Sequence, residues 1–462
     1  RSSGLMRLAV IIALCLPLLA VAQPVVPGFE RFPRDTPAQQ VTAGEVLITE
    51  LNCVACHAAG EDQGRRFQRR PAPVLFTHHN PASAGWMRHW LLDPQKLKPG
   101  TLMPDLLHGL DAEKKSESVE ALRHYLMTLS PGTAPEAAMI GSPVEGKKLY
   151  RSLGCVQCHA PDAQDNGRDI PLGELRSKYT HANLIKFLRD PLHSRPAGRM
   201  PRTPMSEEEA AHLSVYLRDR LKPLDLHGLS RGPAVLKLQQ EGAKLYQTLR
   251  CANCHQSPKL DVQPAFSKPL TEVNPQHGCL APKPVASVPH FQLHAAQRAA
   301  ITAALQAKPA APTLLSKTHR QLRLLNCTAC HDRKALGQPD AQRDELFHGL
   351  GEDLGDEGRR PPTLTGVGAK LTEPALHQVL RGNGAVRPYL ATRMPDFGEA
   401  HAKQLTQLLA AADARADVKP TPRHGNENKV GRNKYGRDLM GVKGLNCISC
   451  HQLAGHKSLG IQ

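Results

Sequence analysis

Apolar residues recur at helical spacing in four segments spread along the chain. In each segment the apolar positions fall three or four residues apart, which places them on one face of a helix. The chain also contains 39 Pro and 36 Gly, which end helices and keep them short. The pattern therefore predicts an all-α protein built from short amphipathic helices. The four segments span residues 119–126, 210–217, 299–305 and 405–409.

A Cys-x-x-Cys-His pattern occurs five times and accounts for ten of the twelve cysteines. Two thiols at this spacing can each form a thioether with a vinyl group of a haem, and the following histidine can coordinate the iron. Cys15 and Cys279 remain outside the pattern. The motifs are Cys53-Val-Ala-Cys56-His57, Cys155-Val-Gln-Cys158-His159, Cys251-Ala-Asn-Cys254-His255, Cys327-Thr-Ala-Cys330-His331 and Cys447-Ile-Ser-Cys450-His451.

A zinc knuckle or a redox disulfide is the alternative interpretation of a Cys-x-x-Cys pair. A structural zinc site needs a second ligand pair at a regular distance, and none accompanies these motifs. A redox disulfide does not require histidine at the next position. We therefore interpret the motifs as attachment sites for haem c. With them the chain resembles the c-type cytochromes, as a string of class I units that are each small, all-helical and hold one haem.

The resemblance implies tandem cytochrome c-like domains joined by Pro- and Gly-rich linkers. Gly44, Gly146 and Gly242 each precede the first cysteine of a motif by nine residues, and Gly146-Lys-Lys-Leu-Tyr150 closely matches Gly242-Ala-Lys-Leu-Tyr246. We expect each unit to open with this helix and to close with one of the four amphipathic helices packed on it. The expected units are 40–131, 140–222, 236–307, 314–412 and a fifth, which we interpret as truncated, over 428–462.

A class I iron takes a methionine sulfur opposite the histidine, so the resemblance also implies sixth ligands. An Asp-Pro pair at Asp93 and again at Asp190 lies ten residues before a Met-Pro pair. Met205 is the competitor in the second unit, but it has no following proline and lies at the start of the closing helix. The expected ligands are Met103, Met200 and Met394.

The third unit contains no methionine. Aligning its Pro-x-Phe with that of the fourth unit puts Val288 where the ligand should be, and valine cannot bind iron. Either this haem is five-coordinate or another group reaches it. We expect His277 to be the sixth ligand, because imidazole binds both oxidation states of iron, whereas Cys279 must first become a thiolate. His290 and His294 are further candidates, which we interpret as surface residues. The fifth motif is followed by eleven residues and no methionine, so its ligand lies elsewhere in the chain or in a missing part.

Residues 1–22 are interpreted as upstream residues 1–5 followed by a cleavable signal peptide that starts at Met6. A short basic start at Met6-Arg7 precedes an apolar run over residues 8–19 and an Ala20-Val21-Ala22 cleavage site, so Cys15 is expected to leave with the signal. Export agrees with haem loading outside the cytoplasm, and the resemblance implies a bacterial periplasm. No other segment is long and apolar enough to cross a membrane, so we expect membrane association to be peripheral at most.

The formal net charge is +17, with a pI near 9.5. Such a charge favours redox partner proteins that are acidic at the contact. Nucleic acid is the other standard partner of a basic chain, and export together with haem argues against it. We therefore expect a periplasmic multihaem cytochrome that transfers electrons along a row of haems. The alternatives are an oxidoreductase with a catalytic third haem, and the electron-entry part of a longer enzyme.

Overall fold

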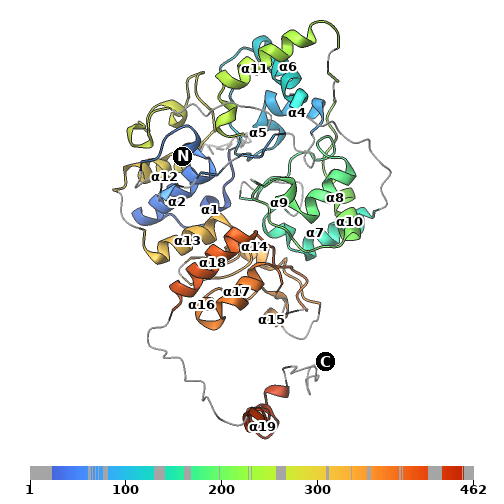
Figure 1. Cartoon of the computed structure of the whole chain (residues 1–462), viewed down its shortest axis with the longest axis vertical. Coiled ribbons are helices and arrows are strands. Elements are labelled where there is room, and N and C mark those ends of the chain that lie inside the picture. The colour runs from blue at the N-terminus through green and yellow to red at the C-terminus, as the bar shows by residue number, and fades with distance from the viewer. Residues whose placement is uncertain are drawn as a thin grey trace, which may run out of the picture.

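All regular elements among the described residues are α-helices and short 3-10 turns, which confirms the expected all-α class (Figure 1). The expected signal peptide and Cys450 lie outside the described residues. This computed structural model describes residues 23–60, 64, 66, 67, 69, 70, 72–75, 82–129, 141–160, 168–196, 198–226, 228, 229, 231–255, 267–308, 312–334, 336–350, 355–383, 387, 389–414, 429–449 and 451.

The α7–α10 cluster follows the sequence expectation for one unit. Helix α7 (Pro143–Ser152) packs directly on α10 (Glu207–Arg218). The helices approach so closely at Gly146 that an added Cβ would lie 2.2 Å from the backbone oxygen of His212. Tyr150 is fully buried in the core of this cluster. The turn η2 (Cys155–Gln157) and the helices α8 (His181–Arg189) and α9 (Pro191–Ser194) connect the pair.

The α13–α18 cluster is built in the same way from the fourth expected unit. Helix α13 (Leu314–Leu324) packs on α18 (Glu399–Ala412). Thr318 stands where the other opening helices carry glycine, and its buried hydroxyl donates to the backbone oxygen of Leu314 at 2.9 Å. Between the two helices lie η6 (Cys327–Ala329), α14 (Ala341–Asp344), α15 (Gly355–Arg359), α16 (Val367–Lys370) and α17 (Glu373–Leu380).

The first and third expected units exchange their closing helices. Helix α2 (Pro37–Glu50) packs on α12 (Ala295–Gln306), and α11 (Val235–Thr248) packs on α6 (Ala112–Leu129). Figure 1 shows α6 beside α11 and α12 beside α2. The prediction that each closing helix packs on the opening helix of its own unit is therefore wrong for these two units.

The same close helix contact forms in both exchanged pairs. A Cβ added at Gly44 would lie 1.9 Å from the backbone oxygen of Ala300, and one added at Gly242 would lie 2.1 Å from that of Ala121. Since no side chain fits at such a distance, glycine is required at both crossings. The chain thus forms the expected helix contacts but takes the partner helix from the other unit.

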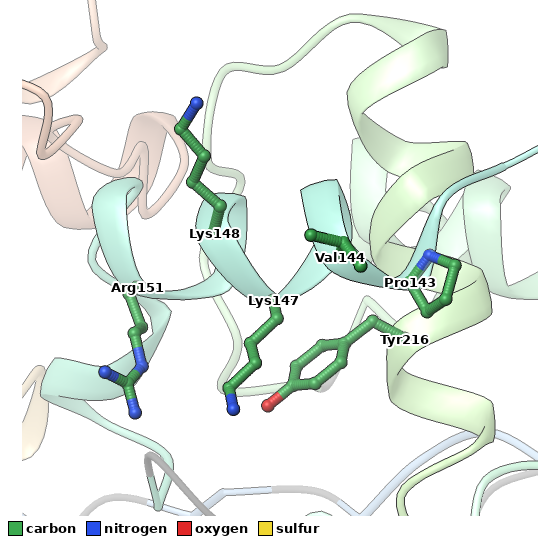
Figure 2. Close-up of a pocket in the computed structure, with 6 residues that line it drawn as sticks. All are labelled: Pro143, Val144, Lys147, Lys148, Arg151 and Tyr216. Atoms are coloured by element: carbon green, nitrogen blue, oxygen red, sulfur yellow. The ribbon is translucent and has the colours of Figure 1, made fainter.

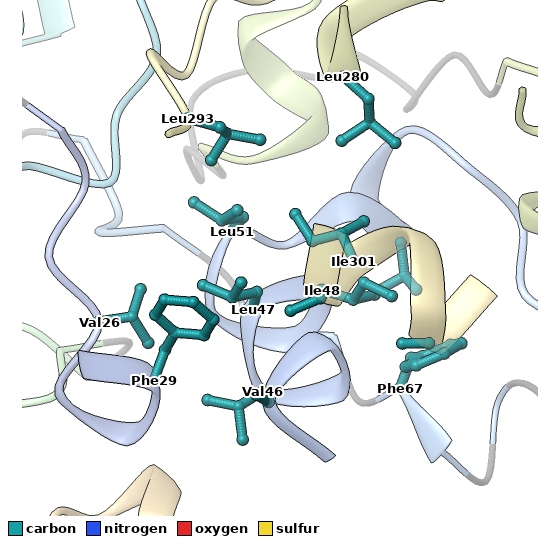
Figure 3. Packing of buried hydrophobic residues seen from close by; sticks show 14 of the residues in the cluster. Val26, Phe29, Val46, Leu47, Ile48, Leu51, Phe67, Leu280, Leu293 and Ile301 are labelled. Atoms are coloured by element: carbon teal, nitrogen blue, oxygen red, sulfur yellow. The ribbon is translucent and has the colours of Figure 1, made fainter. Parts of the chain in front are cut away.

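Each exchanged pair encloses its own hydrophobic core. In the α2–α12 cluster, Leu47 and Ile48 of α2 pack with Leu280 and Ile301 from the third unit (Figure 3). The loop of this cluster includes the turns η4 (Leu270–Glu272) and η5 (Gly278–Leu280). In the α6–α11 cluster, α4 (Ala84–Leu92) and α5 (Pro94–Leu97) lie beside the turn η3 (Cys251–Asn253).

Two short helical segments complete the described part of the chain. Helix α1 (Pro27–Glu30) packs against both α2 and α13 and buries Phe29 completely. Helix α19 (Lys429–Met440) and the turn η7 (Cys447–Ser449) follow α18 and lie apart from the clusters in Figure 1. The turn η1 (Cys53–Ala55) directly follows α2.

Tryptophan fluorescence reports on the exchange, because both tryptophans of the chain, Trp86 and Trp90, belong to the α6–α11 cluster. We expect Gly242→Ala to lower the free energy of unfolding of this cluster by about 1–3 kcal/mol, the usual cost of overpacking. Gly44→Ala should disturb the tryptophan-monitored transition less, because Gly44 lies in the other exchanged cluster. Urea unfolding of both variants, followed by tryptophan fluorescence, shows which variant loses more stability.

Gly436→Ala is the matched control for this pair of variants. Gly436 also lies in a helix, but nothing lies within 4 Å of an added Cβ, so we expect no loss of stability. If Gly44→Ala shifted the tryptophan transition and Gly242→Ala left it unchanged, the helices would pair within their own units and the exchange would be refuted.

Candidate haem sites

The described Cys-x-x-Cys-His motifs share one local backbone structure. The residue before the first cysteine has a positive φ, and the next three residues form a 3-10 turn. The backbone N–H of the histidine then donates to the carbonyl of the first cysteine, at 2.8–3.0 Å. This turn presents the histidine ring at a fixed place relative to the first cysteine. The positive-φ residues are Asn52 (57°), Gly154 (92°), Arg250 (56°), Asn326 (56°) and Asn446 (55°).

The histidine rings of the first four motifs are held in the tautomer that a metal requires. Each Nδ1 lies within hydrogen-bond distance of a backbone carbonyl, and a carbonyl only accepts, so Nδ1 carries the proton and Nε2 keeps its lone pair. Burial lowers the pKa of His159 to about 4 and also lowers the pKa of His255 and His331, which keeps these rings neutral. The contacts are His57 to Lys268 (2.6 Å), His159 to Ile170 (2.8 Å), His255 to Pro73 (2.9 Å) and His331 to Pro362 (2.6 Å).

The carbonyls that contact the histidines come from the units that the helix exchange brings together. The second and fourth motifs use carbonyls of their own units, whereas His57 uses Lys268 and His255 uses Pro73. Backbone hydrogen bonds also connect the first and third units. The Ser267 N–H donates to the carbonyl of Cys56 at 2.7 Å, and the Ala72 N–H donates to the carbonyl of Cys254 at 3.1 Å. The first motif is therefore completed by the third unit, and the third motif by the first unit.

All ten described cysteines are free thiols. Burial raises the pKa of Cys155, Cys251 and Cys327 to about 12, so these thiols stay protonated. No three His, Cys, Asp or Glu side chains of the described residues gather as a metal site would require. Two thiols on one turn beside an imidazole with a free Nε2 fit covalent haem c, which needs two sulfurs and one nitrogen ligand.

Half-buried cations near the second motif also fit haem, which carries two propionate carboxylates. Burial lowers the pKa of Lys98 to about 8, with a further lowering by Arg195. Burial also lowers the pKa of Lys178, whose Nζ lies 4.6 Å from the ring centroid of Trp86. An anionic group placed here would stabilise the charged form of both lysines.

The motifs lie in two contacting pairs. Between the first and third motifs, the Asn253 amide donates to the Ala55 carbonyl at 3.1 Å and lies 3.4 Å from Cys56 Sγ. Asn52 Nδ2 lies 3.8 Å from Cys254 Sγ. Between the second and fourth motifs, Asn326 Nδ2 lies 3.4 Å from Cys158 Sγ. Our sequence analysis missed these amides, although asparagine directly precedes the first cysteine in three of the five motifs.

Isolated β-bridges join the loops that carry the expected sixth ligands. Asp105 pairs with His290, and Arg202 pairs with Asp396, each through two backbone hydrogen bonds of 2.8–3.0 Å. Every bridge residue lies two positions after an expected ligand position. Those positions are Met103, Val288, Met200 and Met394, so Val288 occupies the same register as the three methionines.

The expected methionine ligands and Met205 differ in the side chains and backbone groups that they contact. Met200 and Met205 both pack against the α7–α10 cluster, and Met394 packs against the α13–α18 cluster. The backbone N–H of Met103 donates to the hydroxyl of Thr101 at 3.4 Å. Packing alone therefore does not distinguish Met200 from Met205, because both contact the core of the α7–α10 cluster.

The segment with His277 and Cys279, in which we expected the sixth ligand of the third motif, lies beside the first motif. Cys279 packs against the α2–α12 cluster, and burial together with Cys279 raises the pKa of Cys53. His277 is exposed at the start of η5. His294 caps α12 by accepting from the Gln297 N–H at 3.4 Å, so it has a structural role instead of the free surface position expected.

His290 and His451 complete the expected candidates. The ring of His290 lies 4.9 Å from that of His108, and burial lowers its pKa. His290 is thus part of the contact between two loops, unlike the surface residue expected. His451 of the fifth motif is exposed, and its N–H donates to Cys447 at 2.9 Å.

Residues 143–220 match the family model of cytochrome c. This stretch contains α7, the second motif, Met200 and α10. No curated protein and no solved structure matches the chain. The stretch is therefore a cytochrome c domain, and it supports a c-type cytochrome that holds haem c covalently and transfers electrons.

One buried carboxylate fixes the second motif to its neighbours. Asp169 accepts from Arg31 at 2.9 Å and forms a second ion pair with Arg343. Arg343 also donates to the carbonyls of Val156 and His159 in the second motif. The Asp169 side chain is only 2% exposed, so water cannot replace it as a partner for the two guanidinium groups.

We expect Asp169→Asn to lower the free energy of unfolding by about 3–5 kcal/mol, because it leaves two arginines without their buried counter-charge. Asp340→Asn is the matched control, since Asp340 is 39% exposed and pairs with Arg168 at 3.1 Å, a contact worth about 0–1 kcal/mol. Urea unfolding followed by haem absorbance measures both. Equal, small losses would show that the buried pairs do not stabilise the motif.

Proposed function

We propose that the chain is a periplasmic multihaem c-type cytochrome that transfers electrons among five covalently bound haems. The shared geometry of the motifs carries this proposal. The second motif lies inside the cytochrome c match, and the first, third and fourth repeat its 3-10 turn, its histidine contact to a carbonyl and its half-buried thiols. The fifth repeats the turn in η7.

In this proposal the cysteines of each motif hold one haem by two thioethers, and the histidine Nε2 binds its iron. The bound haem supplies an iron that changes between the ferric and ferrous states. Met103, Met200 and Met394 provide thioether sulfur as sixth ligands, which favours ferrous iron and raises the potential. The β-bridges support this ligand set, because they hold the three methionines at one common register.

The motif pairs suggest the order in which electrons move. Contacts of 3.1–3.8 Å link the first motif with the third and the second with the fourth, so exchange is expected to be fastest inside these pairs. Arg199, next to Met200, contacts Glu50 at the end of α2 and joins the two pairs. The proposed path of the electrons therefore does not pass through the motifs in their order along the chain.

A basic groove beside the second motif is our candidate contact for an acidic redox partner. It measures about 460 Å³ and is lined by Lys147, Lys148 and Arg151 of α7 together with Tyr216 of α10 (Figure 2). Lys147 and Lys148 are exposed. The net charge of +17 attracts anionic partners over a longer range. None of the helices in the described part of the chain is long and apolar enough to span a membrane.

Covalent haem content tests the proposal. The five motifs predict five haems per mature chain, and replacing Cys447 and Cys450 by alanine should lower the number to four. Pyridine haemochrome absorbance against protein mass gives the ratio, and mass spectrometry of haem peptides shows which motifs are loaded. One or two haems per chain would contradict the multihaem proposal.

Oxidation of the reduced protein by ferricyanide, an anionic acceptor, tests the groove. Lys147→Glu with Lys148→Glu should slow the fastest phase several-fold at low ionic strength, and the difference should vanish as salt screens the charges. Lys114→Glu with Lys237→Glu makes the same change in net charge at exposed positions elsewhere. If both double variants slowed the reaction equally, net charge and not this groove would steer the acceptor.

A further inference from the structure

We propose that the haem without a methionine ligand is the one held by the first motif, and that its iron binds small neutral ligands such as carbon monoxide. The chain order of the units suggests the third motif instead. This inference rests on the proposed function, since it assumes that the motifs hold haem. In this assignment Met103 would serve the haem held by the third motif, and Val288 would occupy the ligand position at the first.

The first argument is the exchange of helices and loops. The loop that contains Val288 runs directly into α12, and α12 packs on α2, which ends at the first motif. The loop that contains Met103 runs into α6, and α6 packs on α11, which ends at the third motif. The contact of His57 with Lys268 and that of His255 with Pro73 show the same crossing at the opposite end of each loop.

The second argument comes from the residues around each ligand position. Phe291, three residues after Val288, packs against the α2–α12 cluster, as Phe397 packs against the α13–α18 cluster three residues after Met394. Leu107 is buried in the α6–α11 cluster, four residues after Met103. The residues that follow each ligand position thus pack in the same cluster as the closing helix of that loop.

The residue before each methionine faces a neighbouring cluster. Arg199, before Met200, contacts Glu50 of α2, although Met200 packs in the α7–α10 cluster. Arg393, before Met394, contacts Glu209 of α10 at 2.8 Å, although Met394 packs in the α13–α18 cluster. Leu102 packs against the α2–α12 cluster, so the same alternation would direct Met103 toward the α6–α11 cluster.

The third argument is that the two motif pairs are built alike. Asn52 of the first motif and Asn326 of the fourth each lie near the second cysteine of the partner motif. The first motif therefore corresponds to the fourth, and the third to the second. In this correspondence Val288 replaces Met394, and Met103 matches Met200.

Sequence similarity supports the same correspondence. The opening helix of the third motif carries Gly242-Ala-Lys-Leu-Tyr246, like Gly146-Lys-Lys-Leu-Tyr150 of the second. The segment with Asp93-Pro94 and Met103 resembles the one with Asp190-Pro191 and Met200. One complete unit of the second type is obtained only when α11 is joined with residues 84–107, which is the combination that the structure shows.

The three histidines that were candidate ligands in this loop have other positions or contacts. His277 is exposed, His290 pairs with Asp105 through its backbone, and His294 caps α12. The Cys279 side chain lies near Cys53 of the motif itself, among the apolar residues packed on the α2–α12 cluster. Val288 itself is half-buried, and its side chain offers no donor atom.

Hydrogen peroxide titration of the ferric wild-type protein tests the assignment without any variant. A haem with an open iron position reacts with peroxide faster than a six-coordinate haem, and proteolytic haem peptides identify the motif by mass. Among the first four motifs, we expect the haem on Cys53 and Cys56 to be lost several-fold faster than the others. Faster loss of the haem on Cys251 and Cys254, or equal rates for all four, would overturn the inference.

A pair of variants adds a second readout. Val288→Met should abolish the fast loss of the first haem, lower carbon monoxide binding to the reduced protein by one equivalent and add sulfur-to-iron absorption at the red end of the spectrum. Val285→Met is the control, because Val285 is 63% exposed in the same loop and should leave all three signals unchanged. If Val288→Met protected the third haem instead, the assignment would be reversed.

The outcomes separate this inference from the proposed function. Digests without haem on the Cys53 and Cys251 peptides would contradict the multihaem proposal itself. Haem on both peptides with the wrong order of reaction would contradict only the assignment of Met103 and Val288. The peptide with Cys447 and Cys450 is scored separately, so an open fifth haem does not enter the comparison.

Discussion

The close packing of an opening helix on a closing helix is the constraint on which the rest of this structure depends. Gly44, Gly146 and Gly242 let two helix backbones meet at a distance that no side chain permits. This contact holds the closing helix against the opening helix, and the Cys-x-x-Cys-His turn follows shortly after the end of the opening helix. A closing helix therefore determines which loop covers each motif, whichever part of the chain supplies it.

The exchange between the first and third units changes which Cys-x-x-Cys-His motifs lie next to one another. Because each of these two clusters is made from two distant stretches of chain, neither can be completed without the other. The first and third motifs are brought into contact through Asn52 and Asn253, and the second and fourth meet through Asn326. Two pairs of neighbouring motifs describe the arrangement better than a row of units in chain order.

The sequence allowed the opening and closing helices and the repeated motifs to be predicted, because each depends on local spacing. The partner of each closing helix could not be derived in this way, since α6 and α12 present similar apolar faces and both opening helices carry glycine at the crossing. Lys268 and Pro73 were likewise missed as partners of His57 and His255, because a backbone carbonyl leaves no signal in residue type.

A signal of the exchange was nevertheless present. The third unit had the opening helix of the second unit, with Gly242 and Tyr246, but lacked its methionine loop, and the first unit had that loop without the matching helix. Treating these as two halves of one unit would have predicted the pairing of α11 with residues 84–107. The buried ion pairs of Asp169 gave no comparable signal, because Arg343 lies far away in the sequence.

Photo-oxidative cross-linking of tyrosines tests the exchange most directly. The rings of Tyr125 on α6 and Tyr246 on α11 lie 5.7 Å apart, and those of Tyr150 and Tyr216, within one unit, lie 5.5 Å apart as a built-in control. Our account predicts that mass spectrometry finds both dityrosine-linked peptide pairs in the intact protein. Formation of the Tyr150–Tyr216 link without the Tyr125–Tyr246 link would contradict it.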